Sequence, residues 1–409
     1  MDFQFINGPM NWFHFEIVDD LGRVKQVHLF ADIHDFTNLC PQSFRCKRSK
    51  HSKSKCLEFD YFLELVFQNA FKNKEYTDFF LESPYRLQQR ELVINPGKNY
   101  LDLINQRFEK CLMASKKTCK YLPYIRMHYT DVRIPDYHYI TIGSFVGQIY
   151  YHLIDAVVMY GTNKISKEEL VEFVELFYWV TGMITSHAKE ISLIMMTENN
   201  FESKIEKIFE PFFRSKQKGT LFLKLKTKMA MMIRNLFALV KVRNGTRTFI
   251  VKHQLDKLRR DNVKFDGKNI ADLILSFFVE FSEILSLKAQ LLNREFWKDL
   301  NLIEKVKNLD PKDAMDLANQ LYQLKDQILT NNILFDLTYL DAYILARMFR
   351  VFGKTKHSEQ AIVYAGNLHI QSQKDFFEIF LGLSPIHVES NREGQRCLSN
   401  SEFHEIFLH

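Results

Sequence analysis

Three apolar stretches decide the fold of this chain, and each of them ends in a polar side chain. They read Val27-His-Leu-Phe-Ala-Asp-Ile-His34-Asp35, Thr77-Asp-Phe-Phe-Leu-Glu82-Ser-Pro84 and Gln360-Ala-Ile-Val-Tyr-Ala-Gly-Asn-Leu-His369. Each stretch has the length and composition of a buried β-strand. In an open parallel sheet, ligands and catalytic groups gather at the carboxyl ends of the strands. We therefore predict that these three ends, which come from distant parts of the sequence, form one site.

The patterns of strands and helices are separated along the chain. Strand patterns lie toward the two ends, at residues 13–19, 25–34, 77–82, 124–134 and 360–366, with short helices at 59–71 and 99–113 between them. The middle of the chain has helical spacing, at residues 142–160, 166–190, 203–213, 221–241, 267–292, 312–329 and 336–352. We predict an α/β fold whose mostly parallel central sheet is built from both chain ends and carries a large helical insertion. The predicted parts are the N-terminal half of the core (1–140), the insertion (141–335) and the C-terminal part of the core with a tail (336–409).

Size and composition indicate a helix-rich protein with an aromatic core. The chain has 409 residues, of which 37 are phenylalanine and only 14 are glycine, and this composition excludes a disordered or fibrous protein. Its start, Met1-Asp-Phe-Gln, lacks the pattern of a signal peptide. No apolar run approaches the ~18 residues that a membrane span needs. We expect a protein made in the cytoplasm, without a transmembrane segment.

The six cysteines are too few for a disulfide scaffold in a chain of this length. Cys40, Cys46 and Cys56 lie in one stretch with His51, but their spacings are unlike the close cysteine pairs of a structural zinc site. We expect free thiols in a reducing compartment.

The polar groups that end the three strands form a set of metal ligands. Imidazole and carboxylate groups from His34, Glu82 and His369 suit zinc, manganese or iron and leave a position open for water. Each residue alone has a simpler explanation: a histidine capped by a backbone carbonyl, a carboxylate exposed before a turn, or a histidine at a helix entry. Together they follow strands that lie inside the sheet, where an ionisable group is costly without a partner or a metal. Asp32, two residues before His34, is the expected general base.

Two further acid–arginine pairs are candidates for catalysis. Asp131 and Arg133 lie at the end of the strand at 124–134, and Asp341 and Arg347 lie on the helix ahead of the last strand. An arginine there would stabilise a developing oxyanion, and a bidentate contact with a carboxylate would fix the walls of the site. The structural alternatives are a strand-end ion pair and a polar pair on a core helix.

Positive charge is concentrated in residues 211–255. This segment has no acidic residue and eleven basic ones: Arg214, Lys216, Lys218, Lys224, Lys226, Lys228, Arg234, Lys241, Arg243, Arg247 and Lys252. The whole chain has a net charge of only +6, so the remainder is acidic. A field of one sign over this length favours a polyanionic partner, either nucleic acid or an acidic protein. The alternative is a solvated surface of amphipathic helices.

The three strand ends also resemble a known superfamily, the one that contains the Tiki/TraB proteases, the ChaN-like proteins and the erythromycin esterases. Its members carry a Gly-x-x-His or Gly-Glu-x-His segment, then a strand-end glutamate, then a late Gly-x-x-His segment. Ala31-Asp-Ile-His34, Phe79-Phe-Leu-Glu82 and Gly366-Asn-Leu-His369 resemble these in order, and Tyr339 to Arg350 resembles the helix before the late strand. Ala31 replaces the glycine of the first motif, and Asp32 replaces the glutamate of the esterase branch.

The same segments are similar to uncharacterised proteins of large nucleocytoplasmic DNA viruses. The resemblance implies a metal-assisted hydrolase of peptide or ester bonds, with a divalent metal (zinc, manganese or iron) as cofactor, in the host cytoplasm and in the virion. It does not identify the substrate. The alternative is a catalytically inactive virion protein, structural or mediating interactions, whose basic segment binds nucleic acid or acidic capsid partners.

Overall fold

The chain forms two compact units. The computed structural model describes residues 5–32, 56–84, 100–112, 122–131, 142–215, 220–236, 240–243, 246–351, 358–390, 397–399 and 403–408. The first unit, called the α/β unit here, comprises Met1–Val132, Asp256–Ile274 and Tyr343–His409. The second, called the helical unit, comprises Arg133–Leu255 and Leu275–Ala342. The two ends of the sequence therefore belong to one unit, as the strand patterns require.

A six-stranded sheet forms the centre of the α/β unit. Its strand order is β12 (His387–Ser390), β2 (Asn11–Val18), β3 (Val24–Asp32), β11 (Gln360–Gly366), β5 (Thr77–Pro84) and β6 (Ile125–Asp131). The strands from β3 to β6 are parallel, while β2 and β12 are antiparallel additions at one edge. The predicted α/β fold, with a mostly parallel sheet from both chain ends, is confirmed. Because β11 lies between β3 and β5, a strand from the C-terminal part of the sequence lies between two strands from its N-terminal part.

The two antiparallel strands β2 and β3 form the hairpin that the sequence predicts. Asp19 accepts hydrogen bonds from the backbone N–H groups of Leu21 and Arg23, and Gly22 takes a positive φ of 72°. Both features are typical of tight turns, where an aspartate side chain replaces a backbone acceptor and glycine adopts the left-handed conformation without strain.

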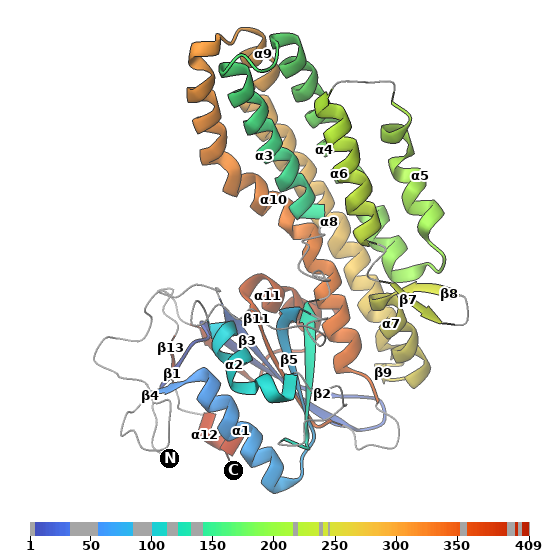
Figure 1. Ribbon diagram of the computed structural model, residues 1–409. Helices are drawn as coiled ribbons and strands as arrows, with labels where there is room; N and C mark the ends of the chain where they lie inside the picture. Colours follow the sequence, from blue (N-terminus) through green and yellow to red (C-terminus); the bar gives the residue numbers. More distant parts are fainter. Residues whose placement is uncertain are drawn as a thin grey trace. The chain divides into compact units, whose positions relative to one another are not determined.

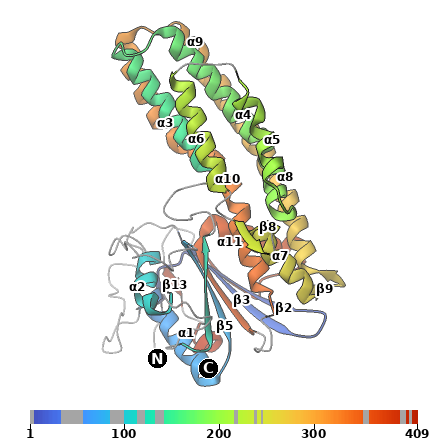
Figure 2. The same cartoon turned by 45° about the vertical axis from the view of Figure 1, so that its right-hand side comes forward.

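Helices cover both faces of the sheet. One face packs on α1 (Phe59–Asn73), α2 (Tyr100–Leu112) and α12 (Phe403–Leu408); Figure 2 shows α1 and α2 on this side of the strands. The core there is aromatic, with Phe30 against Phe59 and Phe59 against Tyr364 at centroid distances of 4.9 Å. The opposite face contacts the last turn of α10 (Ala314–Met348) and a helix made of α11 (Asn367–Asp375) and a π-helical turn, Phe376–Phe380. The ring centroids of Phe377, in that turn, and Phe15 are 4.9 Å apart.

The helical unit is built from long helices that run side by side (Figure 1). They are α3 (Ile142–Gly161), α4 (Lys167–Thr197), α5 (Glu202–Phe213), α6 (Thr220–Leu236), the part of α8 (Ile270–Leu300) from Leu275 onward, and the part of α10 up to Ala342, with short α9 (Leu302–Lys307). Ser166 and Glu169 form a reciprocal capping box at the start of α4, which satisfies two backbone N–H groups there. Among the described residues, no helix is long and apolar enough to cross a membrane.

Three local predictions were wrong. A hairpin of β7 (Val240–Arg243) and β8 (Thr246–Phe249), followed by α7 (Ile250–Asp261), replaces the end of the helix predicted at 221–241. The signal was present in the sequence, because Asn244-Gly245 between alternating β-branched residues is a strong hairpin signal. Helix α10 is continuous where two helices were predicted, and it contains neither proline nor glycine. Cys56 and Cys111 are disulfide-bonded rather than free.

Candidate functional site

Glu82 and His369 lie next to each other at the carboxyl edge of the sheet. One carboxylate oxygen of Glu82, Oε2, accepts a hydrogen bond of 2.7 Å from the backbone N–H of Gly366. The other, Oε1, lies 3.4 Å from Nε2 of His369. Both side chains are buried, with 8% of Glu82 and 3% of His369 exposed. The structure thus brings together two residues that are 287 positions apart.

Local geometry explains why these two side chains meet. Gly366 ends β11 and is the N-cap residue of α11, so its neighbourhood presents backbone N–H groups that have no partner within the helix. A carboxylate is a favourable acceptor at such a helix start. Asn367 and Leu368 are exposed, whereas His369 is turned inward. The tight passage from strand into helix therefore directs His369 back to the end of β5.

Asp32 ends the neighbouring strand at the same edge but points to the other face of the sheet. It pairs in register with Gly366 and is 1% exposed. Strand alternation puts Asp32 on the face of Phe30, which packs on α1. Glu82 shares its face with Phe80, which stacks on His128 on the opposite side. The sequence predicted Asp32 next to the metal ligands. In the structure it lies at the same edge of the sheet as Glu82 and His369, but on the opposite face.

Among the side chains that it describes, the structure does not bring the other predicted site residues to the Glu82–His369 pair. His34 and Arg133 lie outside the described residues, and so does the side chain of Asp131, whose backbone pairs with Pro84 at the end of β6. Asp341 is fully buried on the part of α10 that belongs to the helical unit. Arg347 belongs to the α/β unit and contacts His128.

A buried ionic cluster in the same unit was not predicted. Asp78, fully buried on β5, accepts two hydrogen bonds of 2.7 Å from the guanidinium of Arg126 on β6 and lies 2.8 Å from Nε2 of His128. Lys25 of β3 lies 3.8 Å from the same carboxylate and donates to the carbonyl of Met348 at 2.7 Å. Arg347 lies 3.1 Å from Nδ1 of His128. The cluster joins three strands to the end of α10.

Burial and charge shift the pKa values of this cluster strongly. Burial alone would raise the pKa of Asp78, but the hydrogen bond from His128 and the charges of Lys25 and Arg126 hold it far below its usual range. Burial lowers the pKa of His128 to about 4, against the opposing effect of Asp78. Burial also lowers the pKa of Lys25 to about 8. At neutral pH the cluster contains an ionised Asp78 and a neutral His128.

The hydrogen bonds of His128 assign it a structural role. A guanidinium can only donate, so Nδ1 of His128 is the acceptor of Arg347 and the ring proton lies on Nε2, which donates to Asp78. Both ring nitrogens are therefore occupied, and neither accepts a proton from a substrate. Sequence reasoning missed the cluster because Lys25, Asp78 and Arg126 are each the second residue of a strand, where a charged side chain usually indicates exposure.

The Glu82–His369 pair has the spacing of two ligands of one metal ion. Ligand atoms that each lie about 2.0–2.1 Å from a tetrahedral zinc ion are about 3.3–3.4 Å apart. The separation of Oε1 and Nε2 is 3.4 Å. Within the described ranges no group of three histidine, cysteine or acidic side chains is placed to bind a metal. A complete centre therefore requires a further donor, and His34 is the predicted one.

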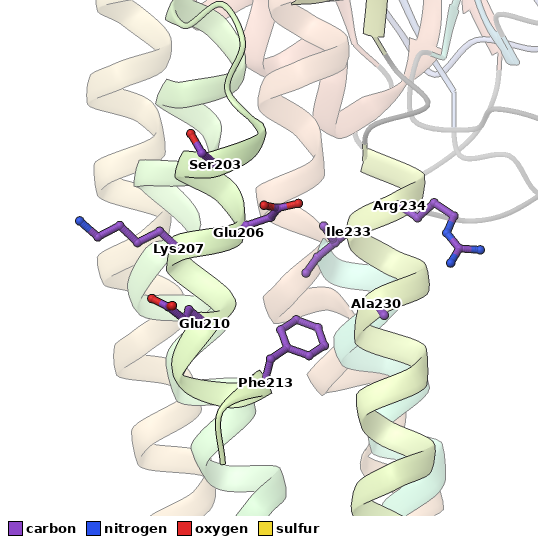
Figure 3. A pocket seen from close by; sticks show the side chains of 8 residues that line it. All are labelled: Ser203, Glu206, Lys207, Glu210, Phe213, Ala230, Ile233 and Arg234. Atoms are coloured by element: carbon purple, nitrogen blue, oxygen red, sulfur yellow. The ribbon is translucent and has the colours of Figure 1, made fainter. Parts of the chain in front are cut away.

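The helical unit contains a groove that is separate from this edge of the sheet. It has a volume of about 640 Å³ and lies between α5 and α6 (Figure 3). Phe213 and Ile233 contribute apolar surface, and Glu206 and Arg234 contribute charges of opposite sign. None of the predicted site residues lines it.

Part of the basic segment serves the fold of the helical unit. Lys226 donates to the backbone carbonyl of Phe213 at 2.8 Å, which satisfies an acceptor at the end of α5. Arg214 pairs with Glu210, and Lys252 is buried. Lys224 and Arg234, in contrast, are exposed. The count of basic residues in the sequence therefore overstates the charge available to a partner.

Comparison with known proteins adds no relative to this account: no protein-family model, no curated protein and no solved structure matches the chain.

Proposed function

We propose that this protein is a metal-assisted hydrolase of peptide or ester bonds, with its site at the carboxyl edge of β3, β11 and β5. The observation that carries the proposal is the pairing of Glu82 with His369, two buried ionisable side chains at the spacing of metal ligands. Their position at the ends of parallel strands is where catalytic groups gather in α/β proteins.

Each residue has a distinct role in the proposal. Glu82, His369 and His34 would hold the ion, and the Gly366 N–H keeps the Glu82 carboxylate in one orientation. When bound, the ion would supply Lewis-acid activation of water and of the scissile carbonyl. Asp32 lies on the opposite face of the sheet, so the proposal gives it no direct part in activating this water.

Oxyanion stabilisation is assigned to Arg133 and not to Arg347. The guanidinium of Arg347 is engaged with His128 in the buried cluster, so turning to a substrate would leave the Nδ1 acceptor without this donor. Arg133 follows the strand β6, whose end lies next to the end of β5. Arg133 itself lies outside the described residues, so this role rests on its place in the sequence.

The proposal is tested by hydrolysis assays on the full chain with Zn²⁺, Mn²⁺ or Fe²⁺, against an ester panel and a peptide panel. We expect Glu82→Gln and His369→Gln each to lower the rate by about 10²- to 10⁴-fold. Matched controls are Glu206→Gln in the α5–α6 groove and His187→Gln on the surface of α4, which should leave the rate unchanged. Equal losses in the controls, or no hydrolysis by the native chain with any of the three metals, would reject the proposal in favour of an inactive virion component.

A further inference from the structure

Helix α8 exposes an apolar stripe on the surface of the helical unit. Ile284, Leu287 and Leu291 are 62%, 55% and 57% exposed. Their other side faces the unit: Leu285 and Ser286 are buried, and Ser286 donates to the carbonyl of Thr185 on α4. The helix therefore buries one face and offers another face of three aliphatic side chains to a partner.

The stripe has the spacing of a coiled-coil seam and a charge at each end. Glu280, Ile284, Leu287, Leu291 and Arg294 follow one another at intervals of four, three, four and three residues, which is the heptad pattern of helices that pair along their length. Glu283 is held by Lys189 of α4. Neither Glu280 nor Arg294 takes part in an ion pair among the described residues, and both are exposed.

We propose that this stripe is the interface with a second copy of the chain, in which the two α8 helices pack antiparallel about a two-fold axis near Leu287. In this orientation Glu280 of each copy lies toward Arg294 of the other, at both ends of the seam. A parallel pair would instead put Glu280 opposite Glu280 and Arg294 opposite Arg294, which like-charge repulsion disfavours. The single patch is complementary to itself, as a two-fold interface requires.

The proposed contact between the two α8 helices is small, and its size determines the expected affinity of the dimer. The seam spans about 21 Å from Glu280 to Arg294 at 1.5 Å per residue, and three aliphatic side chains fall well short of the roughly 800 Å² per partner of a stable interface. The dimer is therefore weak and depends on concentration, with a Kd on the order of micromolar.

The experiment is sedimentation velocity of the full chain over a range of concentrations. We expect the native chain to shift from monomer to dimer as its concentration rises, and Leu287→Glu to remain monomeric because it brings two carboxylates together at the two-fold axis. Leu223→Glu on α6 is the matched control, since Leu223 is 54% exposed outside the stripe, and it should dimerise like the native chain. A native chain that stays monomeric up to about 100 μM, roughly a hundred times the expected Kd, would overturn the proposal.

Charge reversal at the two ends of the stripe tests the antiparallel orientation of the helices and leaves the three aliphatic residues unchanged. We expect Glu280→Arg and Arg294→Glu each to raise the Kd by about three- to tenfold, because each puts like charges at both ends of the antiparallel seam. The double variant restores the opposite-charge contacts and should return the Kd to the native value. Additive weakening in the double variant, or no effect of either single change, would overturn the antiparallel dimer. Circular dichroism of each variant establishes that it is folded.

Discussion

The α/β unit and the helical unit differ in which polar groups they bury. The α/β unit encloses charged and ionisable side chains, among them Asp78, Arg126, Glu82 and His369. Most buried polar residues of the helical unit are Ser or Thr, and the hydroxyl groups of Thr181 and Thr185 donate to carbonyls of their own helix. Among the side chains described in this unit, Lys252 and Asp341 are the buried charged exceptions.

The difference follows from how each unit satisfies its backbone. A helix makes its hydrogen bonds within itself, so a bundle can exclude charge from its core. A parallel sheet joins strands that end and turn, and its edges collect side chains that need partners from several elements. The α/β unit is therefore expected to depend on a few specific charge contacts, and the helical unit on close packing. Four predictions test this contrast, from the largest expected effect to the smallest.

Breaking the buried ionic cluster should have the largest effect. Asp78→Asn removes the carboxylate that contacts both Arg126 and Lys25 and leaves the two buried cations without this negative charge. We expect a loss of about 3–5 kcal/mol in the stability of the α/β unit. Hydrogen exchange of peptides covering β5 and β6, with urea unfolding, measures it. Glu210→Gln breaks a pair in the helical unit whose members are 42% and 78% exposed; it should change stability by at most about 1 kcal/mol. Equal losses of stability for Asp78→Asn and Glu210→Gln would contradict the proposed difference between the two units.

Lowering the pH should destabilise the α/β unit before the helical unit. The pKa of His128 is about 4 in the folded state against 6.5 for an ordinary histidine, so the unfolded chain binds the extra proton. Stability therefore falls as the pH drops from about 6.5 to about 4, by roughly 2–3 kcal/mol from this residue. We expect His128→Gln to flatten this part of the pH dependence. His187→Gln, at an exposed pair with Glu190 on α4, should leave the curve unchanged; a flattened curve in that control would show that the dependence arises elsewhere.

Two glycines of the helical unit separate packing from helix propensity. A Cβ atom on Gly161 would lie 2.8 Å from Cβ of Ala314, whereas one on Gly182 meets nothing within 4 Å. We expect Gly161→Ala to destabilise the unit by about 1–3 kcal/mol, and Gly182→Ala to stabilise it by up to about 1 kcal/mol, because alanine is the better helix former. Thermal unfolding followed by circular dichroism compares them. A stabilising Gly161→Ala would mean that the contact between α3 and Ala314 is loose.

The smallest expected effect distinguishes the two kinds of lysine on α6. Lys226→Met removes the hydrogen bond to the carbonyl of Phe213 and should cost about 0.5–1.5 kcal/mol. Lys224→Met, at an exposed position, should leave stability unchanged and weaken any salt-sensitive retention of the chain on DNA. Should Lys226→Met lower retention and not stability, the structural role assigned to Lys226 is wrong.

The sequence predicts elements well where periodicity is strong and fails where contacts decide. The strand at 360–366 and the start of the strand at Thr77 follow from short apolar runs, although β5 continues two residues beyond the predicted end at Glu82. The meeting of Glu82 with His369 was predictable because both follow strands of one parallel sheet. The sequence did not predict the sheet face on which Asp32 lies. Alternation along one strand does not identify the face on which residues of the neighbouring strands lie. The cluster around Asp78 was missed for a related reason: its charges lie at strand starts, where sequence patterns indicate exposure.

The central claim is that Glu82, His369 and His34 act as one site, and metal stoichiometry tests it most directly. Elemental analysis of the native chain after loading with zinc, manganese or iron and removal of free metal should give about one ion per chain, the occupancy of a single three-ligand site. The double variant His34→Ala/His369→Ala should give none, while its circular dichroism stays native. Equal metal content in the native chain and the double variant, or no retained metal in the native chain, would contradict the account.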